Sequence, residues 1–319
     1  MTPHAASPQL PLGSLEDRGP PFRDFLISLT TISTLATVLR FWSRSLNRPR
    51  LKRSRFWWDD WVALTATVGS VAEVSLVLQA VHLGLGKHIW AIPTANLSYL
   101  KLMFAAGILF NVSLFLAKTS ALLFLSRVFP RHASPPWFNI ALPIIHSLNI
   151  AWFVGIALGL VLICNPISKN WNFALPGRCG KLTDLYLGNA LPSIAIDLAI
   201  LILPIPLIWG VQTSRTRKAC ITLVFIMGYS SVIVAIGRLV TVLHAGKLIN
   251  EDRTYEGIPH YYWVMAEVPI MIVSISLPAM LPLARHIDEC YYRPFTSSFA
   301  RSFANDTRQR YENINISAD

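Results

Sequence analysis

Three acidic residues stand inside long apolar stretches of the sequence: Glu73, Asp197 and Glu267. A charged side chain in the middle of a membrane-spanning helix costs about 2.5–3.5 kcal/mol on insertion scales, so each one needs a partner or a function. Each carboxyl group could bond to a neighbouring helix, or could line a hydrated cavity that receives a ligand or moves a proton. In such a cavity it could also act as a general acid on an apolar substrate.

Two basic residues lie in the same kind of stretch. Each residue of a helix adds about 1.5 Å along its axis, and on this scale Arg238 falls at about the depth of Glu267. We expect an ion pair between them to be geometrically allowed, which makes Arg238 a fourth candidate functional residue. Lys118 falls near the inner end of its stretch, where its long side chain could extend to water.

The elements that position these residues are membrane-spanning helices. The chain has 319 residues, of which 53% are hydrophobic and 14% charged, and its mean hydropathy is +0.46. A soluble domain could not cover so much apolar side chain with polar surface, and about 20 apolar residues suffice to cross a bilayer. The sequence predicts an all-α, polytopic bundle of seven helices, at about residues 24–42, 60–82, 100–125, 137–164, 185–209, 219–243 and 261–283.

The charges between these spans predict the orientation. The net charge of +11 would suggest nucleic acid in a soluble protein, but here the basic residues lie in short runs between apolar segments. Cytoplasmic loops carry an excess of Lys and Arg. Two loops have that excess, one with Arg44, Arg48, Arg50, Lys52, Arg53 and Arg55, the other with Arg215, Arg217 and Lys218. The N-terminus is therefore expected outside the cytosol and the C-terminus inside, with no nucleic acid as partner.

The predicted inner face also contains a candidate ion pair. Arg40 lies at the inner end of the first span, level with Asp59 and Asp60 at the inner start of the second. Opposite charges at one depth compensate one another, so we interpret these three residues as a structural ion pair on the inner face.

Cysteine positions add a predicted cross-link. Cys164 and Cys179 both fall at the mouth of the outer loop between the fourth and fifth spans, on the oxidising side of the membrane. A disulfide between them is the natural pairing. Among the sequons, only Asn96 lies in a predicted outer loop, and it is the candidate glycosylation site.

The chain ends are expected to stand apart from the bundle. We divide the chain into an extracytoplasmic head of residues 1–23, a transmembrane domain of residues 24–284 and a cytoplasmic tail of residues 285–319. The tail is polar, mixed in charge and short for a folded domain, so disorder is the default expectation.

Common catalytic motifs are not spelled out in this sequence. It contains no His-Glu-x-x-His, no Asp-rich diphosphate-binding pattern, no P-loop and no Gly-x-Ser-x-Gly. We therefore expect no metal and no cofactor. A retinal Schiff base needs a lysine in the last span, and residues 261–283 contain none.

Several motifs, in order along the chain, resemble the fungal rhodopsin-like heptahelical membrane proteins. They include Arg55-Phe-Trp-Trp-Asp-Asp-Trp61, Gly84-Leu-Gly-Lys-His88, and Cys164 and Cys179 on either side of Trp171. Further along the chain the resemblance rests on Lys118, Asn189, Asp197, Leu203-Pro-Ile-Pro-Leu207, Arg217-Lys218, Gly228, Arg238, Glu267, Leu277-Pro278 and Leu281-Pro282. It covers about residues 24–285.

The resemblance implies a seven-helix membrane protein associated with secondary metabolism, of a family that also contains receptors. Some relatives are described as members of toxin or secondary-metabolite gene clusters, others as pathogenicity-related G-protein-coupled receptors. This chain has no cysteine-rich segment before the first span. Two further classes stay open: a receptor-like sensor that meets a cytosolic partner at its basic loops, and an intramembrane enzyme with a buried carboxyl as acid. A small apolar ligand or substrate fits either class, in the plasma membrane or an endomembrane.

Overall fold

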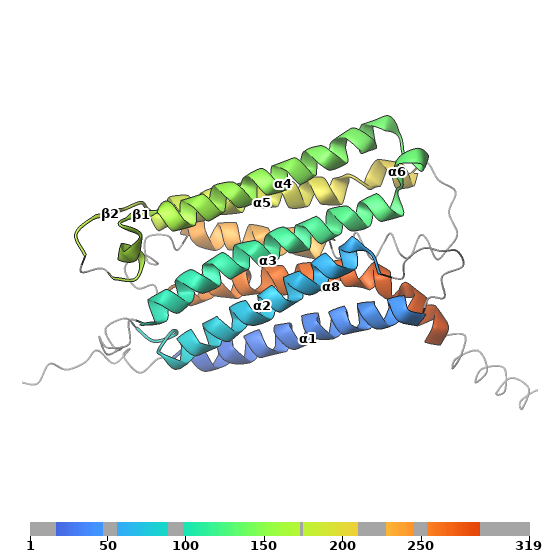
Figure 1. The fold of residues 1–319 in the computed structure, drawn as a ribbon. Helices are drawn as coiled ribbons and strands as arrows, with labels where there is room; N and C mark the ends of the chain where they lie inside the picture. The colour runs from blue at the N-terminus through green and yellow to red at the C-terminus, as the bar shows by residue number, and fades with distance from the viewer. Residues whose placement is uncertain are drawn as a thin grey trace, which may run out of the picture.

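A computed structural model describes residues 17–46, 56–88, 98–172, 175–209, 228–244 and 254–287. The long helices are α1 (Gly19–Leu46), α2 (Trp58–His82), α3 (Ser98–Val128), α4 (Pro136–Leu162), α5 (Leu182–Ile202) and α8 (Ile258–Ile287). α6 (Ile205–Trp209) continues α5, and a further apolar helix covers Gly228–His244. The helices lie side by side as one elongated bundle (Figure 1).

In the described part of the chain, these helices make up seven apolar membrane spans. Six are long and apolar enough to cross a membrane, with α5 and α6 forming one span of Leu182–Leu207, and Gly228–His244 is a shorter seventh. The predicted all-α, seven-helix membrane bundle is therefore confirmed. The predicted sixth span began at residue 219, and residues 219–227 lie outside the described part of the chain, as do most of the predicted head and tail. The sidedness of the two termini stays a prediction.

α8 is the central helix of the bundle, and α4 is a peripheral one. In their most apolar windows, 61% of the residues of α8 are buried but only 22% of those of α4. The outer face of α4 exposes large apolar side chains, and lipid is the solvent that fits such a face. They include Ile140, Ile144, Leu148, Val154, Leu158 and Leu162.

α1 and α8 lie side by side although they stand at opposite ends of the described chain (Figure 1). Ser43 Oγ donates to Ala279 O at 2.8 Å and accepts from Leu283 N at 3.3 Å. In an undisturbed helix the N–H of Leu283 would bond to the carbonyl of Ala279. The hydroxyl of Ser43 therefore bridges a backbone donor and acceptor of α8 and ties it to α1.

The glycine-rich turn after α2 joins three segments at one end of the bundle. Gly86 has φ +107°, a conformation that L side chains rarely adopt, and its space for a Cβ is filled by the backbone of Gly19. Its carbonyl accepts from Arg18 N at 3.1 Å and its N–H donates to Thr254 O at 3.0 Å. Glycine at this position lets the turn hold the starts of both α1 and α8.

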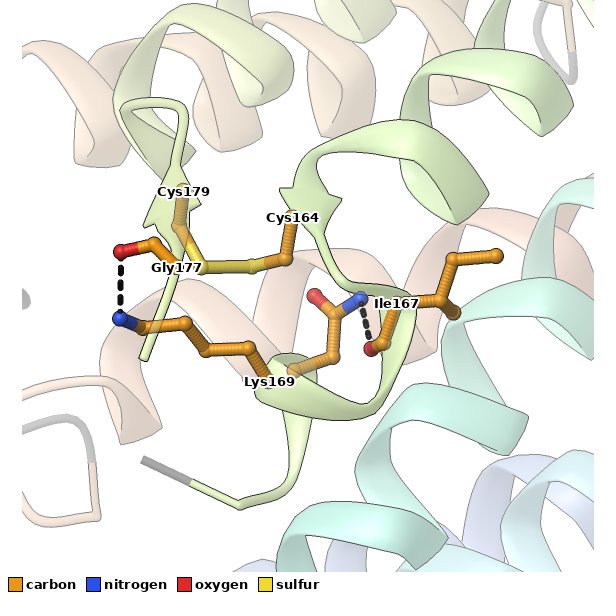
Figure 2. Close-up of a disulfide and its surroundings, with 6 residues drawn as sticks. Cys164, Ile167, Lys169, Gly177 and Cys179 are labelled. Carbon is orange, nitrogen blue, oxygen red and sulfur yellow. Dashed lines mark hydrogen bonds between the residues drawn. A yellow bond between two sulfur atoms is a disulfide. The ribbon is translucent and has the colours of Figure 1, made fainter. Parts of the chain in front are cut away.

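The predicted disulfide is present and closes a small loop at the same end. Cys164 and Cys179 are bonded, with 2.02 Å between the sulfurs, and they are paired residues of the two short strands β1 (Cys164–Asn165) and β2 (Arg178–Cys179). Figure 2 shows Lys169 reaching across the loop to donate to Gly177 O, at 2.7 Å. The short helices η5 (Ile167–Asn170) and η4 (Arg131–Ala133) complete the described elements.

Candidate functional site

A buried chain of polar contacts crosses the middle of the bundle. Arg238 Nε lies 2.8 Å from Glu267 Oε2, and Arg238 Nη2 donates to Glu267 Oε1 at 3.2 Å. Ser193 Oγ donates to the same Oε1 at 3.4 Å. Lys118 Nζ donates to the carbonyl oxygen and the hydroxyl of Ser193, at 2.8 and 2.9 Å, and lies 2.7 Å from Asp197 Oδ1. The helix of residues 228–244, α8, α5 and α3 all contribute.

Lys118 corrects one of the sequence-based expectations. Its side chain does not extend to water, because none of it is exposed. Instead the ammonium group is compensated inside the bundle by the carboxylate of Asp197 and the two oxygens of Ser193. Depth alone placed Lys118 within reach of the membrane surface. Its position depends instead on which side of α3 carries Lys118, and that side faces α5.

Glu73 lies beside this chain without joining it. It is 2% exposed, and within the described residues its Oε1 accepts no hydrogen bond. It is close enough to Glu267 for the two carboxyl groups to interact electrostatically. Ser70 and Ser113 also have buried hydroxyl oxygens without a hydrogen-bond partner in the part of the chain that the structure describes. The five groups of the buried cluster are thus Glu73, Lys118, Asp197, Arg238 and Glu267.

One end of this cluster opens into a cavity of about 380 Å³ beside the disulfide, which we call the disulfide-side cavity. Arg238 lines it, and so do Asn111 and Asn189, which are joined by a 3.2 Å hydrogen bond. Most of the remaining wall is apolar, from side chains that include Met103, Phe104, Phe110, Ile156, Leu160 and Val264. An apolar pocket with a few convergent polar groups is the usual form of a small-molecule site.

The other end of the cluster reaches a smaller cavity of about 70 Å³. Asp197 lines it together with Ser231 and Met271. Glu267 is in the wall of neither cavity among the described lining residues, and nor is Glu73. The contact chain from Arg238 to Asp197 therefore joins the two cavities through closely packed side chains.

A second ionic cluster holds the opposite end of the bundle. Arg40 Nη2 lies 2.7 Å from Asp59 Oδ2 and its Nε lies 2.8 Å from Asp60 Oδ1, with all three side chains fully buried. Arg127 adds contacts of 2.9 and 3.3 Å to the same two carboxylates. Arg40 Nη1 also donates to the carbonyl of Ile275 at 2.6 Å. These contacts connect α1, α2, α3 and α8, which suits a structural role.

Three contributors to these sites were missed by the reasoning from sequence. Ser193 and Asn111 carried no charge to mark them, although a polar residue inside an apolar span is itself a signal. Arg127 was the clearest available signal, as a basic residue at the inner end of a predicted span. Asn96, the predicted glycosylation site, lies outside the described residues.

Fold and site together define a class: a multi-pass, seven-helix membrane protein with a mostly apolar cavity that leads into a buried charged cluster. Residues 39–286 match the model of the fungal rhodopsin domain, which is more than half of the chain. The chain therefore belongs to the fungal rhodopsin domain family. No solved structure gives a significant match.

Named relatives come from fungi. The chain is 23% identical over 279 residues to the polyenoic acids biosynthesis gene cluster protein Ba17b of Metarhizium anisopliae, covering 82% of this chain and 73% of that protein. It is 26% identical over 236 residues to an SAT4 family membrane protein of Emericella nidulans, covering 74% and 59% of the two chains. It is 25% identical over 287 residues to the receptor GIN3 of Arthrobotrys oligospora, covering 86% and 65%.

Proposed function

We propose that this protein binds a small, mostly apolar molecule in the disulfide-side cavity and takes part in specialised metabolism. The cavity itself carries the first half of the proposal, because its apolar wall and the polar groups at Arg238, Asn111 and Asn189 suit a molecule with an apolar body and a polar end. The proposed role in specialised metabolism is supported by relatives that are named after biosynthesis gene clusters.

A receptor-like role for the same site is the second candidate. The contacts from Arg238 through Glu267, Ser193 and Lys118 to Asp197 provide a path by which an occupied cavity could shift the packing at the far side of the bundle. One relative is named a receptor. Within this candidate, the basic loops at residues 44–55 and 215–218 would contact the cytosolic partner.

The enzyme alternative gains no support from the cavity. A general acid must reach the bound substrate, yet none of the three buried carboxyl groups lines the disulfide-side cavity among its described residues. Two of them, Asp197 and Glu267, are occupied by cations. Binding therefore accounts for this arrangement better than catalysis does.

A cavity-filling substitution tests the proposal. Gly107 lines the cavity, and a Cβ there would meet only Leu160 Cδ2, at 3.7 Å, so Gly107→Leu can enter the cavity without displacing backbone. Gly155→Leu is the matched control, since Gly155 is exposed on α4 and a Cβ there would meet nothing within 4 Å.

The readout is the metabolite profile of the host after gene deletion and complementation, measured beside the amount of protein in the membrane. We expect the parent gene and Gly155→Leu to restore the profile, and Gly107→Leu to reach the membrane without restoring it. An unchanged profile after deletion would contradict the metabolic role. Full restoration by Gly107→Leu would contradict the role of the cavity.

A further inference from the structure

The charged side chains described in the wall of the disulfide-side cavity are basic. Among its described lining residues, the charged ones are Arg238 and Lys169, one is the buried histidine His260, three are tyrosines and none is acidic. Lys169 stands in the disulfide loop, and His260 and Arg238 stand deeper, in the helices. A wall of this kind favours an anionic group over a cationic one, because the field of the fixed charges acts across a low-dielectric space.

Within the part of the chain that the structure describes, one side of the Arg238 guanidinium group has no polar partner. Its Nε and Nη2 face Glu267, which leaves Nη1 outside that pair, and the side chain lines the cavity. The guanidinium group has five N–H donors in a planar fork, so it can hold one carboxylate along one edge and a second anion along another.

Charge balance in the buried cluster limits what can bind there. It holds three carboxyl groups, on Glu73, Asp197 and Glu267, but only two cations, on Lys118 and Arg238. Each cation contacts one carboxylate, so Glu73 is left over, next to Glu267. An uncompensated charge this deep is strongly unfavourable, and the cluster is neutral when Glu73 carries a proton.

Among the described residues, no further charged group near Glu267 offsets the difference. The groups that interact with it are Glu73 from α2, Lys118 from α3, Asp197 from α5 and Arg238 from the helix of residues 228–244. α1 has no charged residue between Asp24 and Arg40, and α4 has only His146 as a titratable group. An anion added at Arg238 would therefore leave one unbalanced negative charge within the bundle.

We propose that the disulfide-side cavity binds apolar molecules that carry one anionic group, and that each is bound together with one proton, which Glu267 accepts. The proposal rests on the ligand site proposed above and specifies its chemistry. The anionic group lies against Arg238 and the apolar body against the wall around Phe104 and Phe110. The proton is released by the buffer acid in solution, no covalent bond to the ligand forms or breaks, and the cluster is neutral before and after binding.

Three probes of one chain length separate the parts of this proposal. Octane-1-sulfonate stays ionised at every working pH, octanoate is the carboxylate counterpart, and octan-1-ol is neutral. Binding is measured by calorimetry on the full chain in lipid nanodiscs, with empty nanodiscs and Gly107→Leu as blanks. We expect the sulfonate and octanoate to bind at least about tenfold more tightly than the alcohol.

Proton uptake is counted by repeating the titration at one pH in buffers with different ionisation enthalpies. Because the sulfonate cannot accept a proton, the expected uptake of about one proton per sulfonate belongs to the protein. Glu267→Gln should bind the sulfonate without uptake. Glu73→Gln, which resembles a carboxyl group that is already protonated, should keep the uptake of the parent, and so should His260→Asn.

The results distinguish a failure of the anion proposal from a failure of the proposal that the cavity binds a ligand. Equal affinity for octan-1-ol and the sulfonate, blocked in Gly107→Leu, would overturn the anion proposal and leave the cavity as a ligand site. Binding that Gly107→Leu does not reduce would contradict the cavity itself. Uptake that is absent in the parent, or that His260→Asn abolishes, would overturn Glu267 as the acceptor. Uptake that persists in Glu267→Gln would overturn Glu267 as the acceptor as well. If Glu267→Gln does not fold, uptake that is lost in Glu73→Gln still overturns the proposal.

Discussion

Lys118 Nζ lies 2.7 Å from Asp197 Oδ1, and the side chains of both residues are buried. The pair connects α3 to α5 inside the bundle. Removing one charge of such a pair leaves the other uncompensated, which in buried pairs costs about 3–5 kcal/mol, whereas removing both costs much less.

We expect Asp197→Asn and Lys118→Met each to lower the melting temperature and folded yield strongly, and the double variant to recover most of the loss. Thermal unfolding of the purified variants measures this as a double-mutant cycle. If the two losses simply add in the double variant, the pair does not act as a unit.

Arg40 gives a second stability prediction, with a control at the other end of the same helix. Arg40→Met leaves the fully buried Asp59 and Asp60 without their closest cation and removes a hydrogen bond to Ile275 O, so we expect a loss of about 3–5 kcal/mol. Arg23 pairs with Asp24 at the exposed start of α1, and Arg23→Met should change stability by less than about 1 kcal/mol. Chemical unfolding of both variants checks the contrast. Equal effects would argue against a structural role for the inner cluster.

The disulfide predicts equal behaviour of its two cysteines. Closing a loop with a sequence separation of 15 restricts the unfolded chain by about 3 kcal/mol in the chain-entropy model. Cys164→Ser and Cys179→Ser should therefore lose similar stability, and the double variant little more than either one. Thiol labelling of the unreduced parent protein is the direct measurement, and modification of either residue there would contradict the bond.

Topology is tested by reporter fusions. The excess of basic residues predicts that fusions after Arg50 and Arg217 report the cytosol, and that fusions after Lys87 and Asp252 report the opposite side. The disulfide supports the same sense, because disulfides persist on the oxidising side and Cys164 lies at the same end of the bundle as the turn containing Lys87. Reporters that place both termini on one side would contradict the seven-helix topology.

Hydropathy predicted the helices well but could not predict which faces meet. Each span was identified because a run of apolar residues is a one-dimensional property of the chain. The break between α5 and α6, next to Pro204, is visible in the sequence as the Leu203-Pro-Ile-Pro-Leu207 motif, yet it was treated there as part of one span. The structure keeps one span here but divides it into two helices, because Pro204 and Pro206 have no N–H to donate to the preceding turn.

The contacts of the charged residues also differ in how far the sequence could predict them. The pairing of Arg238 with Glu267 follows from depth, since both stand at one level of neighbouring spans. Lys118 with Asp197 does not follow from depth, because it depends on the rotation of α3 about its own axis. Ser193 was harder still to predict, because its hydroxyl group belongs to the cluster only through its hydrogen bonds with Lys118 and Glu267.

The pair of Lys118 and Asp197 also sets a condition on how the chain is made. Spans enter the membrane in the order of synthesis, and the whole of α4 is synthesised between these two residues. Arg40 meets its two carboxylate partners as soon as α2 arrives, but Lys118 enters with α3 before any part of α5 exists. We therefore expect α3 to stay beside the insertion machinery, where water still reaches the lysine, until α5 brings the carboxylate and both helices can pass into lipid together.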